Sequence, residues 1–168
     1  VFPEFDDTRR RGLRRHPAFA PAYDASGPVP VIYGCGNCLI RRSVFTRLGE
    51  NVTDAAEASA VTRHYLEVLQ AIAAKGIRCE PSIKLTQLGL DLGAEQAYAN
   101  LRALAERSHA TGNYLWIDME QTSYVDVTLD LTRRLKAEFP RVGVCLQAYL
   151  YRTPDDLKTL VDEGIGVR

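Results

Sequence analysis

The sequence predicts an α/β fold, specifically part of a (β/α)8 barrel of the TIM type with about half of its strands present. Short apolar runs alternate with segments that carry apolar residues at helical spacing, and this order is typical of βαβ units with a parallel sheet. The apolar runs are nearly continuous, as in strands that are buried on both faces. Several runs end in a polar side chain, which is where such barrels build their active sites.

Residues 1–47 are predicted to form an irregular segment outside the barrel. This segment is rich in Pro, Arg and Gly, and Pro28 and Pro30 interrupt the apolar stretch that continues to Tyr33. Cys35 and Cys38 form a CxxC pair. A zinc or redox role is the less favoured interpretation, because a second cysteine pair and a preceding βαβ unit are absent from the sequence.

The first helix is predicted from Asp54 to Lys75. Thr53 is its expected N-cap and Gly76 its expected end. The run from Ile77 to Leu85 then predicts a strand. One face of the helix carries the apolar residues Val61, Tyr65, Val68, Leu69 and Ile72.

The same alternation continues to the end of the chain. Helices are expected where apolar residues recur at helical spacing, with Gly112 and Pro140 as the stops of two of them, and strands where short apolar runs follow. The expected elements are a helix over 94–110, a strand over 114–119, a helix over 125–138, a strand over 142–146, a helix that opens at Thr153 and Pro154, and a last strand from Val167.

Charge and composition argue against several classes of function. The formal net charge is zero, with 21 basic and 21 acidic residues, so nothing indicates a nucleic-acid partner. No apolar run approaches the roughly 20 residues that span a bilayer, and no signal peptide is visible. The histidines His16, His64 and His109 are scattered, so no metal site is expected. Cysteine usage fits a reducing compartment and a cytoplasmic location.

Three strand ends in succession carry a polar side chain, namely Lys84, Asp118 and Gln147. For any one of them, a helix cap or a loop hydrogen bond is the commoner explanation. Three in succession favour a shared site at the barrel rim. A lysine ammonium there needs an anion or loses its proton, so Lys84 is expected to bind a substrate carboxylate, to act as a Schiff-base amine, or to pair with Asp118.

The other polar residues suggest how this rim is arranged. Asp118 and Glu120 are expected to point to the same side, with Met119 opposite, because alternate residues of a strand share a face. Gln147 offers both a donor and an acceptor but has no useful pKa. It therefore suits the edge of a flavin or another heteroaromatic ring better than it suits proton transfer.

Four blocks of this sequence resemble consecutive blocks of the proline dehydrogenase family in residues, order and spacing. The resemblance covers about residues 48–168, whereas residues 1–47 show no clear match. The blocks are LGEN at Leu48–Asn51, SIKLTQLG at Ser82–Gly89, WIDME at Trp116–Glu120 and LQAYLYRT at Leu146–Thr153.

The resemblance implies a distorted barrel with FAD at its C-terminal mouth. There L-proline is oxidised to 1-pyrroline-5-carboxylate, and the electrons pass to a quinone, which leaves open a peripheral position on the inner face of a respiratory membrane. By the same resemblance, Lys84 helps to hold the proline carboxylate and Asp118 belongs to the active-site hydrogen-bond network. Met119 and Gln147 would contact the flavin. Arg168 matches an arginine beside the flavin and is counted with Asp118 as catalytic.

Two alternatives stay open at this point. The family continues beyond the position of Arg168 with further strands and a substrate-binding arginine pair, so one alternative is a truncated, inactive fragment. Such an open half barrel would expose sheet edges and self-associate. The second alternative follows from residue chemistry alone and is a Schiff-base lyase with Lys84 as the amine.

Overall fold

The structure is a computed structural model that describes residues 31–32, 39–40, 52–76 and 80–168. The chain divides into two compact units. One unit comprises Val1–Gly34 and Leu39–Arg47, and the other comprises Cys35–Cys38 and Leu48–Arg168. Several features of the sequence lie outside the described residues. They are most of the segment predicted to be irregular, the CxxC pair, the LGEN block and the first residues of the strand predicted from residue 77.

The first unit contains one short antiparallel ladder. β1 (Val31–Ile32) pairs with β2 (Leu39–Ile40), so that Val31 lies opposite Ile40. The sequence placed both strands within an irregular segment. β1 begins directly after Pro30, a position at which a strand tolerates proline because no ladder N–H is needed there.

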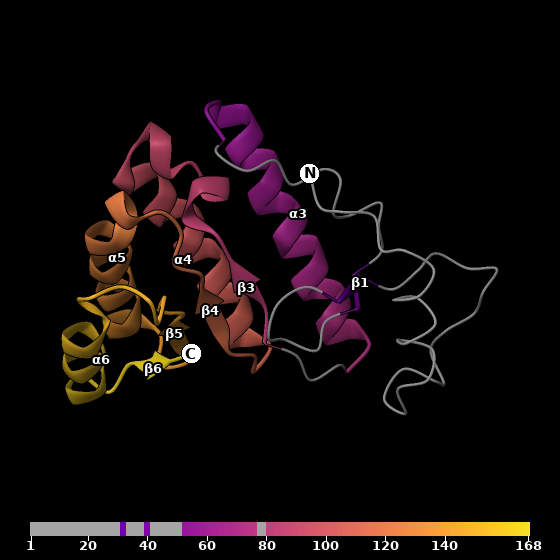
Figure 1. Cartoon of the computed structure of the whole chain (residues 1–168). Coiled ribbons are helices and arrows are strands. Elements are labelled where there is room, and N and C mark those ends of the chain that lie inside the picture. Colours follow the sequence, from indigo (N-terminus) through magenta and orange to yellow (C-terminus); the bar gives the residue numbers. More distant parts are fainter. Residues whose placement is uncertain (1–30, 33–38, 41–51, 77–79) are drawn as a thin grey trace, which may run out of the picture. The chain divides into compact units, whose positions relative to one another are not determined.

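The second unit is built on a parallel sheet of four strands. Every neighbouring pair in the order β3-β4-β5-β6 is parallel, and a helix connects each strand to the next (Figure 1). This arrangement confirms the predicted part of a (β/α)8 barrel. The strands are β3 (Ser82–Ile83), β4 (Leu115–Ile117), β5 (Val142–Val144) and β6 (Gly166–Val167).

The helices agree closely with the sequence pattern. α4 (Ala94–Ala110) and α5 (Val125–Glu138) have the predicted bounds, and α6 (Thr153–Asp162) begins at the predicted residue. α3 packs against α4, and α4 packs against α5 (Figure 1). Among residues 52–76 and 80–168, no helix is both long and apolar enough to cross a membrane.

The predicted cap of the first helix is wrong by one residue. α3 (Ala55–Ala74) has Asp54, not Thr53, as its N-cap. The Asp54 Oδ1 accepts hydrogen bonds from the backbone N–H groups of Ala56 at 2.6 Å and Glu57 at 3.2 Å. Aspartate caps at least as well as threonine, and its charge also complements the helix dipole.

The first strand of the barrel is shorter than predicted at its C-terminal end. β3 stops at Ile83, and the chain then forms two 3-10 turns, Leu85–Leu88 and Leu90–Leu92. Gly89 joins them with φ 92°, a left-handed conformation that favours glycine. Because Leu85 and Leu88 are fully buried, the apolar run continues past the strand, and an apolar run alone cannot distinguish a strand from a buried turn.

The two faces of the sheet have different roles. Ile83, Ile117 and Val144 lie in register on adjacent strands and are buried. They share the core with leucines of α4 and α5, such as Leu101 and Leu135. The residues one position earlier, Ser82, Trp116, Gly143 and Gly166, are also in register and point to the opposite face.

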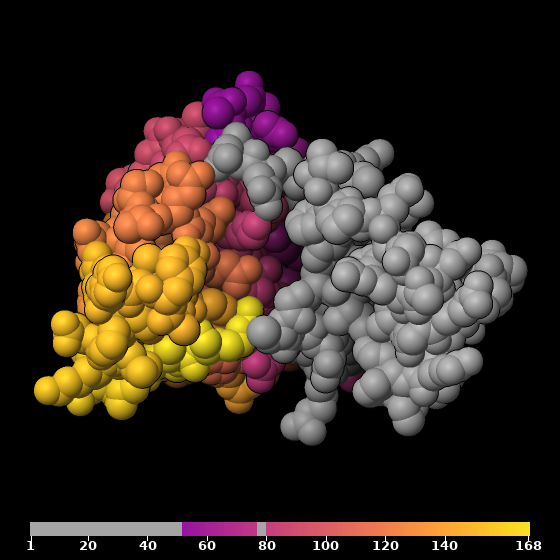
Figure 2. All heavy atoms as spheres, viewed as in Figure 1, coloured from indigo at the N-terminus to yellow at the C-terminus, as the bar shows by residue number. Residues whose placement is uncertain are grey.

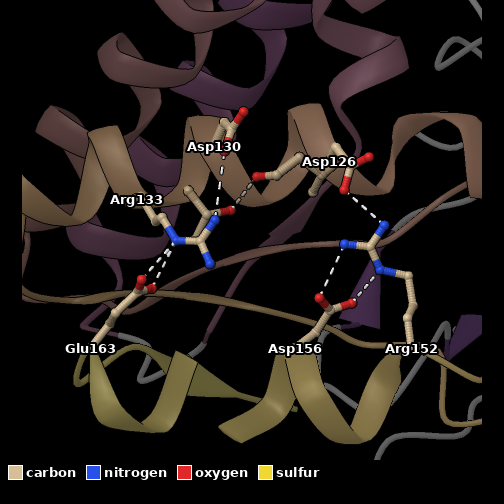
Figure 3. A network of polar contacts seen from close by, with 8 residues as sticks. Asp126, Asp130, Arg133, Arg152, Asp156 and Glu163 are labelled. Carbon is tan, nitrogen blue, oxygen red and sulfur yellow. Dashed lines mark hydrogen bonds and ion pairs between the residues drawn. The ribbon is translucent and has the colours of Figure 1, made fainter. Parts of the chain in front are cut away.

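Ion pairs tie the outer helices together. On α5 and α6, Arg133 contacts Glu163 at 2.8 Å, and Arg152 contacts Asp126 and Asp156 at 2.7 Å each (Figure 3). The two helices form one continuous surface in the space-filling view (Figure 2). Each pair has at least one partner that solvent reaches readily, so each is expected to contribute little stability.

Candidate functional site

The C-terminal ends of the four parallel strands bring one residue each into a common row. Backbone hydrogen bonds extend the sheet by one residue beyond the strands, from Asp118 N to Ile83 O at 2.8 Å and from Arg168 N to Val144 O at 3.0 Å. Since parallel partners point to the same side, this row continues the face that carries Trp116. Its members are Lys84, Asp118, Cys145 and Arg168.

Asp118 and Arg168, the two residues predicted to be catalytic, form an ion pair. The Arg168 Nη2 lies 3.2 Å from the Asp118 Oδ1, and the two side chains are only 26% and 31% exposed. The Ser82 hydroxyl joins them, because it donates to the Asp118 carboxylate and accepts from Arg168 at 3.1 Å. The guanidinium of Arg168 also lies 5.3 Å from the centre of the Trp116 ring. Ser82 is a functional candidate that the sequence pattern alone does not identify.

Cys145 is a free, half-buried thiol in the same row. Burial, together with the hydrogen bond to Asp118 and its negative charge, raises the pKa of Cys145 to about 12, although Arg168 opposes the shift. The thiol therefore stays protonated at neutral pH and acts as a weak donor toward Asp118 rather than as a nucleophile. Cys145 was not predicted from the sequence as a site residue. Alternate residues of a strand share a face, so Cys145 lies on the same face of the sheet as Gly143 and its neighbour Trp116.

The high pKa of Cys145 predicts a loss of stability at alkaline pH. A thiol that resists ionisation in the folded chain contributes stability that is complete below its ordinary pKa of 9.0 and is lost as the pH rises toward 12. The unfolding free energy of the parent should therefore fall more steeply above pH 9 than that of Cys145→Ser, which cannot ionise. Urea titrations at pH 8, 9, 10 and 11 measure this difference. Parallel curves for the two proteins would contradict it.

Glu120 connects the β4 end to the turn after β3. Its Oε2 accepts from the Thr86 N–H at 3.0 Å, and its Oε1 accepts from the Thr86 hydroxyl at 2.5 Å. β4 has already ended at Ile117. The carboxylates of Asp118 and Glu120 nevertheless both reach toward the neighbouring strand, Asp118 to Ser82 in β3 and Glu120 to Thr86 in the turn after β3. Both of them also raise the pKa of Tyr65, after the larger effect of burial.

Gln147 and Met119 lie on the other side of Glu120. The Gln147 Nε2 donates to the backbone carbonyl of Glu120 at 2.7 Å, and more weakly to that of Met119 at 3.5 Å. These bonds fix the orientation of the amide. Its Oε1 is buried and accepts no hydrogen bond from the described residues. Met119 is buried in the core, so it is less accessible than the polar residues of the row.

Lys84 follows β3 directly and precedes the 3-10 turn Leu85–Leu88. It is half-buried, and its extended backbone places it in the row with Asp118. Its carbonyl accepts from the Gln87 N–H at 3.2 Å, which closes the turn. The described residues include no group of three or more His, Cys, Asp or Glu side chains placed to hold a metal ion.

Known proteins with similar sequences all point to the same family. A family model described as proline dehydrogenase matches residues 39–164. The chain is 35% identical over 153 residues to proline dehydrogenase 1 of Bacillus subtilis (strain 168). This alignment covers 91% of this chain and 49% of the Bacillus protein. It is 33% identical over 126 residues to proline dehydrogenase of Deinococcus radiodurans. That match covers 72% of this chain and 41% of the Deinococcus protein. The chain spans about half the length of the curated relatives it matches.

Solved structures show the same fold. Proline utilization A from Bdellovibrio bacteriovorus, inactivated by N-propargylglycine, superposes with a TM-score of 0.61 at 24% identity, over 71% of this chain and 16% of that chain. A mutant of proline utilization A from Bradyrhizobium japonicum gives a TM-score of 0.63 at 20% identity, over 71% of this chain and 15% of that chain. At these identities the likeness concerns the fold alone.

Proposed function

This chain belongs to the proline dehydrogenase family, and on that premise we propose that it forms part of a site where L-proline is oxidised to 1-pyrroline-5-carboxylate with FAD as cofactor. The electrons then pass to a quinone. The observation that carries this proposal is the Asp118–Arg168 pair, bridged by Ser82, at the C-terminal ends of the strands. That edge is where barrels of this type build their active sites.

The residues present fit a bound flavin. A buried amide oxygen without a hydrogen-bond partner is uncommon in folded proteins, and the Gln147 Oε1 is such an atom among the described residues. A flavin ring carries an N–H group from which this oxygen would accept a hydrogen bond. Gln147 and Met119 are therefore the proposed contacts of the flavin. When bound, FAD supplies the acceptor for the hydride that leaves proline.

The charged residues have complementary proposed roles. Lys84 provides a cation for the carboxylate of proline. Arg168 provides a fixed positive charge that favours transfer of negative charge toward the cofactor, and Asp118 with Ser82 holds its guanidinium in place. Residues 48–168 are proposed to carry this site and residues 1–47 to form a separate segment. We place the protein in the cytoplasm, at the inner face of a respiratory membrane when it delivers electrons.

Titration with FAD tests the proposed cofactor site. The change Gln147→Leu removes the buried acceptor, so the affinity for FAD should fall about tenfold, in line with leaving a ligand N–H unpaired. Gln121→Leu is the matched control, because Gln121 is exposed and should leave the affinity unchanged. Quenching of flavin fluorescence measures both. Equal affinity in the parent and Gln147→Leu would contradict the assignment.

The two alternatives give other results in the same preparation. An inactive fragment that self-associates would bind no flavin and would elute as an oligomer in size-exclusion chromatography. A Schiff-base lyase would be trapped by borohydride as a substrate adduct on Lys84, without any need for flavin.

A further inference from the structure

Glu120 is the residue that connects three consecutive strand ends. It follows β4, its side chain binds Thr86 in the turn after β3, and its backbone carbonyl binds Gln147 after β5. The contact with Thr86 is two-pronged, because one carboxylate oxygen takes the N–H and the other takes the hydroxyl. Hydrogen bonds to a carboxylate are roughly twice as strong as those between neutral groups.

The Thr86 contact anchors the turn that directly follows Lys84. Thr86 is 1% exposed, and it lies in the turn that begins directly after Lys84 and is closed by the bond from Gln87 N to Lys84 O. A short 3-10 turn has poorer hydrogen-bond geometry than an α-helix. An anchor on its second residue therefore limits how far Lys84 can shift relative to Asp118.

A second contact holds the same turn from the other side. The hydroxyl of Tyr65, on α3, donates to the Gln87 Oε1 at 2.8 Å. The raised pKa of Tyr65 keeps this hydroxyl protonated, so it remains a donor. Two more hydrogen bonds reach the turn, from the Val52 N–H to the Thr86 carbonyl at 3.2 Å and from the Asn100 Nδ2 on α4 to the Leu88 carbonyl at 2.9 Å. Among these contacts in the described residues, the one from Glu120 comes from a residue that also binds Gln147.

We propose that Glu120 is a positioning residue, which fixes the turn that carries Lys84 and thereby sets the affinity of the site for the carboxylate of its amino-acid substrate. This inference rests on the proposed function for the identity of the substrate. Glu120 itself touches neither substrate nor cofactor in this account. Its effect is transmitted through Thr86 to Lys84.

Amide hydrogen exchange on the full chain tests the contact directly. Glu120→Gln and Thr86→Val each weaken the two-pronged contact, so amides of residues 85–88 should exchange about tenfold faster, while those of α5 stay unchanged. Thr86→Ser keeps both donors and should exchange like the parent. Unchanged exchange in both weakened variants would overturn the proposal.

Steady-state kinetics with L-proline tests the consequence for the substrate. KM should rise about tenfold in Glu120→Gln and Thr86→Val, kcat should stay within threefold, and Thr86→Ser should restore the parent KM. A fall in kcat with an unchanged KM would overturn the positioning role. If the parent oxidises no proline, the proposed function fails and the statement about substrate affinity falls with it, whereas the exchange result still decides whether Glu120 holds the turn.

Discussion

Asp118→Asn is expected to slow the reduction of bound flavin by L-proline by about 100-fold or more. The asparagine keeps the shape of the side chain but removes the charge that pairs with Arg168 at 3.2 Å. The half-buried guanidinium would then lack its carboxylate, and the Ser82 hydroxyl would lose its charged acceptor. Losing one preorganised electrostatic group in an active site typically costs a factor of about 100 to 1,000 in rate.

A rapid-mixing experiment that follows flavin absorbance under anaerobic conditions measures this rate. Asp130→Asn is the control, because Asp130 is a 71% exposed carboxylate on α5 that contacts only the exposed Arg133 in the described structure. Its rate should equal that of the parent. A rate for Asp118→Asn within threefold of the parent would show that the pair has no part in the reaction.

Gly143→Ala is expected to lower the free energy of unfolding by about 3 kcal/mol, at the upper end of overpacking effects. A Cβ at this position would lie 2.5 Å from the Trp116 Cζ3 and 2.6 Å from the backbone oxygen of Gly166. The ring could turn aside, but the backbone oxygen belongs to the neighbouring strand and cannot move without opening the sheet. Urea unfolding followed by circular dichroism measures the loss.

Gly166→Ala provides an informative comparison for this prediction. Its Cβ would meet the hydroxyl of Tyr114, which is the far end of a side chain. Removing that hydroxyl in the double variant Gly166→Ala/Tyr114→Phe should recover part of the lost stability. The same hydroxyl would lie 2.9 Å from a Cβ at Gly143, but the closer contact with the Gly166 backbone oxygen would remain, so Tyr114→Phe should rescue Gly143→Ala much less. Equal rescue of the two glycine variants would contradict the view that the backbone contact is decisive for Gly143.

The helices could be predicted from the sequence because their signals are local. α4 and α5 each have a regular apolar face and are followed by a terminating residue, Gly112 and Pro140 respectively, and their bounds agree with the prediction. The end of β3 was not predictable in the same way. Leu85 and Leu88 are as apolar as a strand but lie in a turn, and only the left-handed Gly89 marks the difference.

The candidate site was only partly predictable for a related reason. Asp118 and Arg168 could be identified from strand ends and from family resemblance, but their contact through Ser82 depends on the register of strands that are far apart in the chain. Cys145 and Thr86 belong to the site for the same reason. Their types, a thiol and a hydroxyl within apolar runs, carry no functional signal of their own.

The most direct test of the account is an anaerobic absorbance spectrum of the full chain with bound FAD, recorded before and after addition of L-proline. If the proposed contacts of Lys84 and of the Asp118–Arg168 pair with the substrate are correct, the flavin band should bleach with L-proline and not with D-proline, because they would form a fixed, chiral set. A chain that retains no flavin at saturating FAD, or a flavin band that L-proline leaves unchanged, would contradict the account.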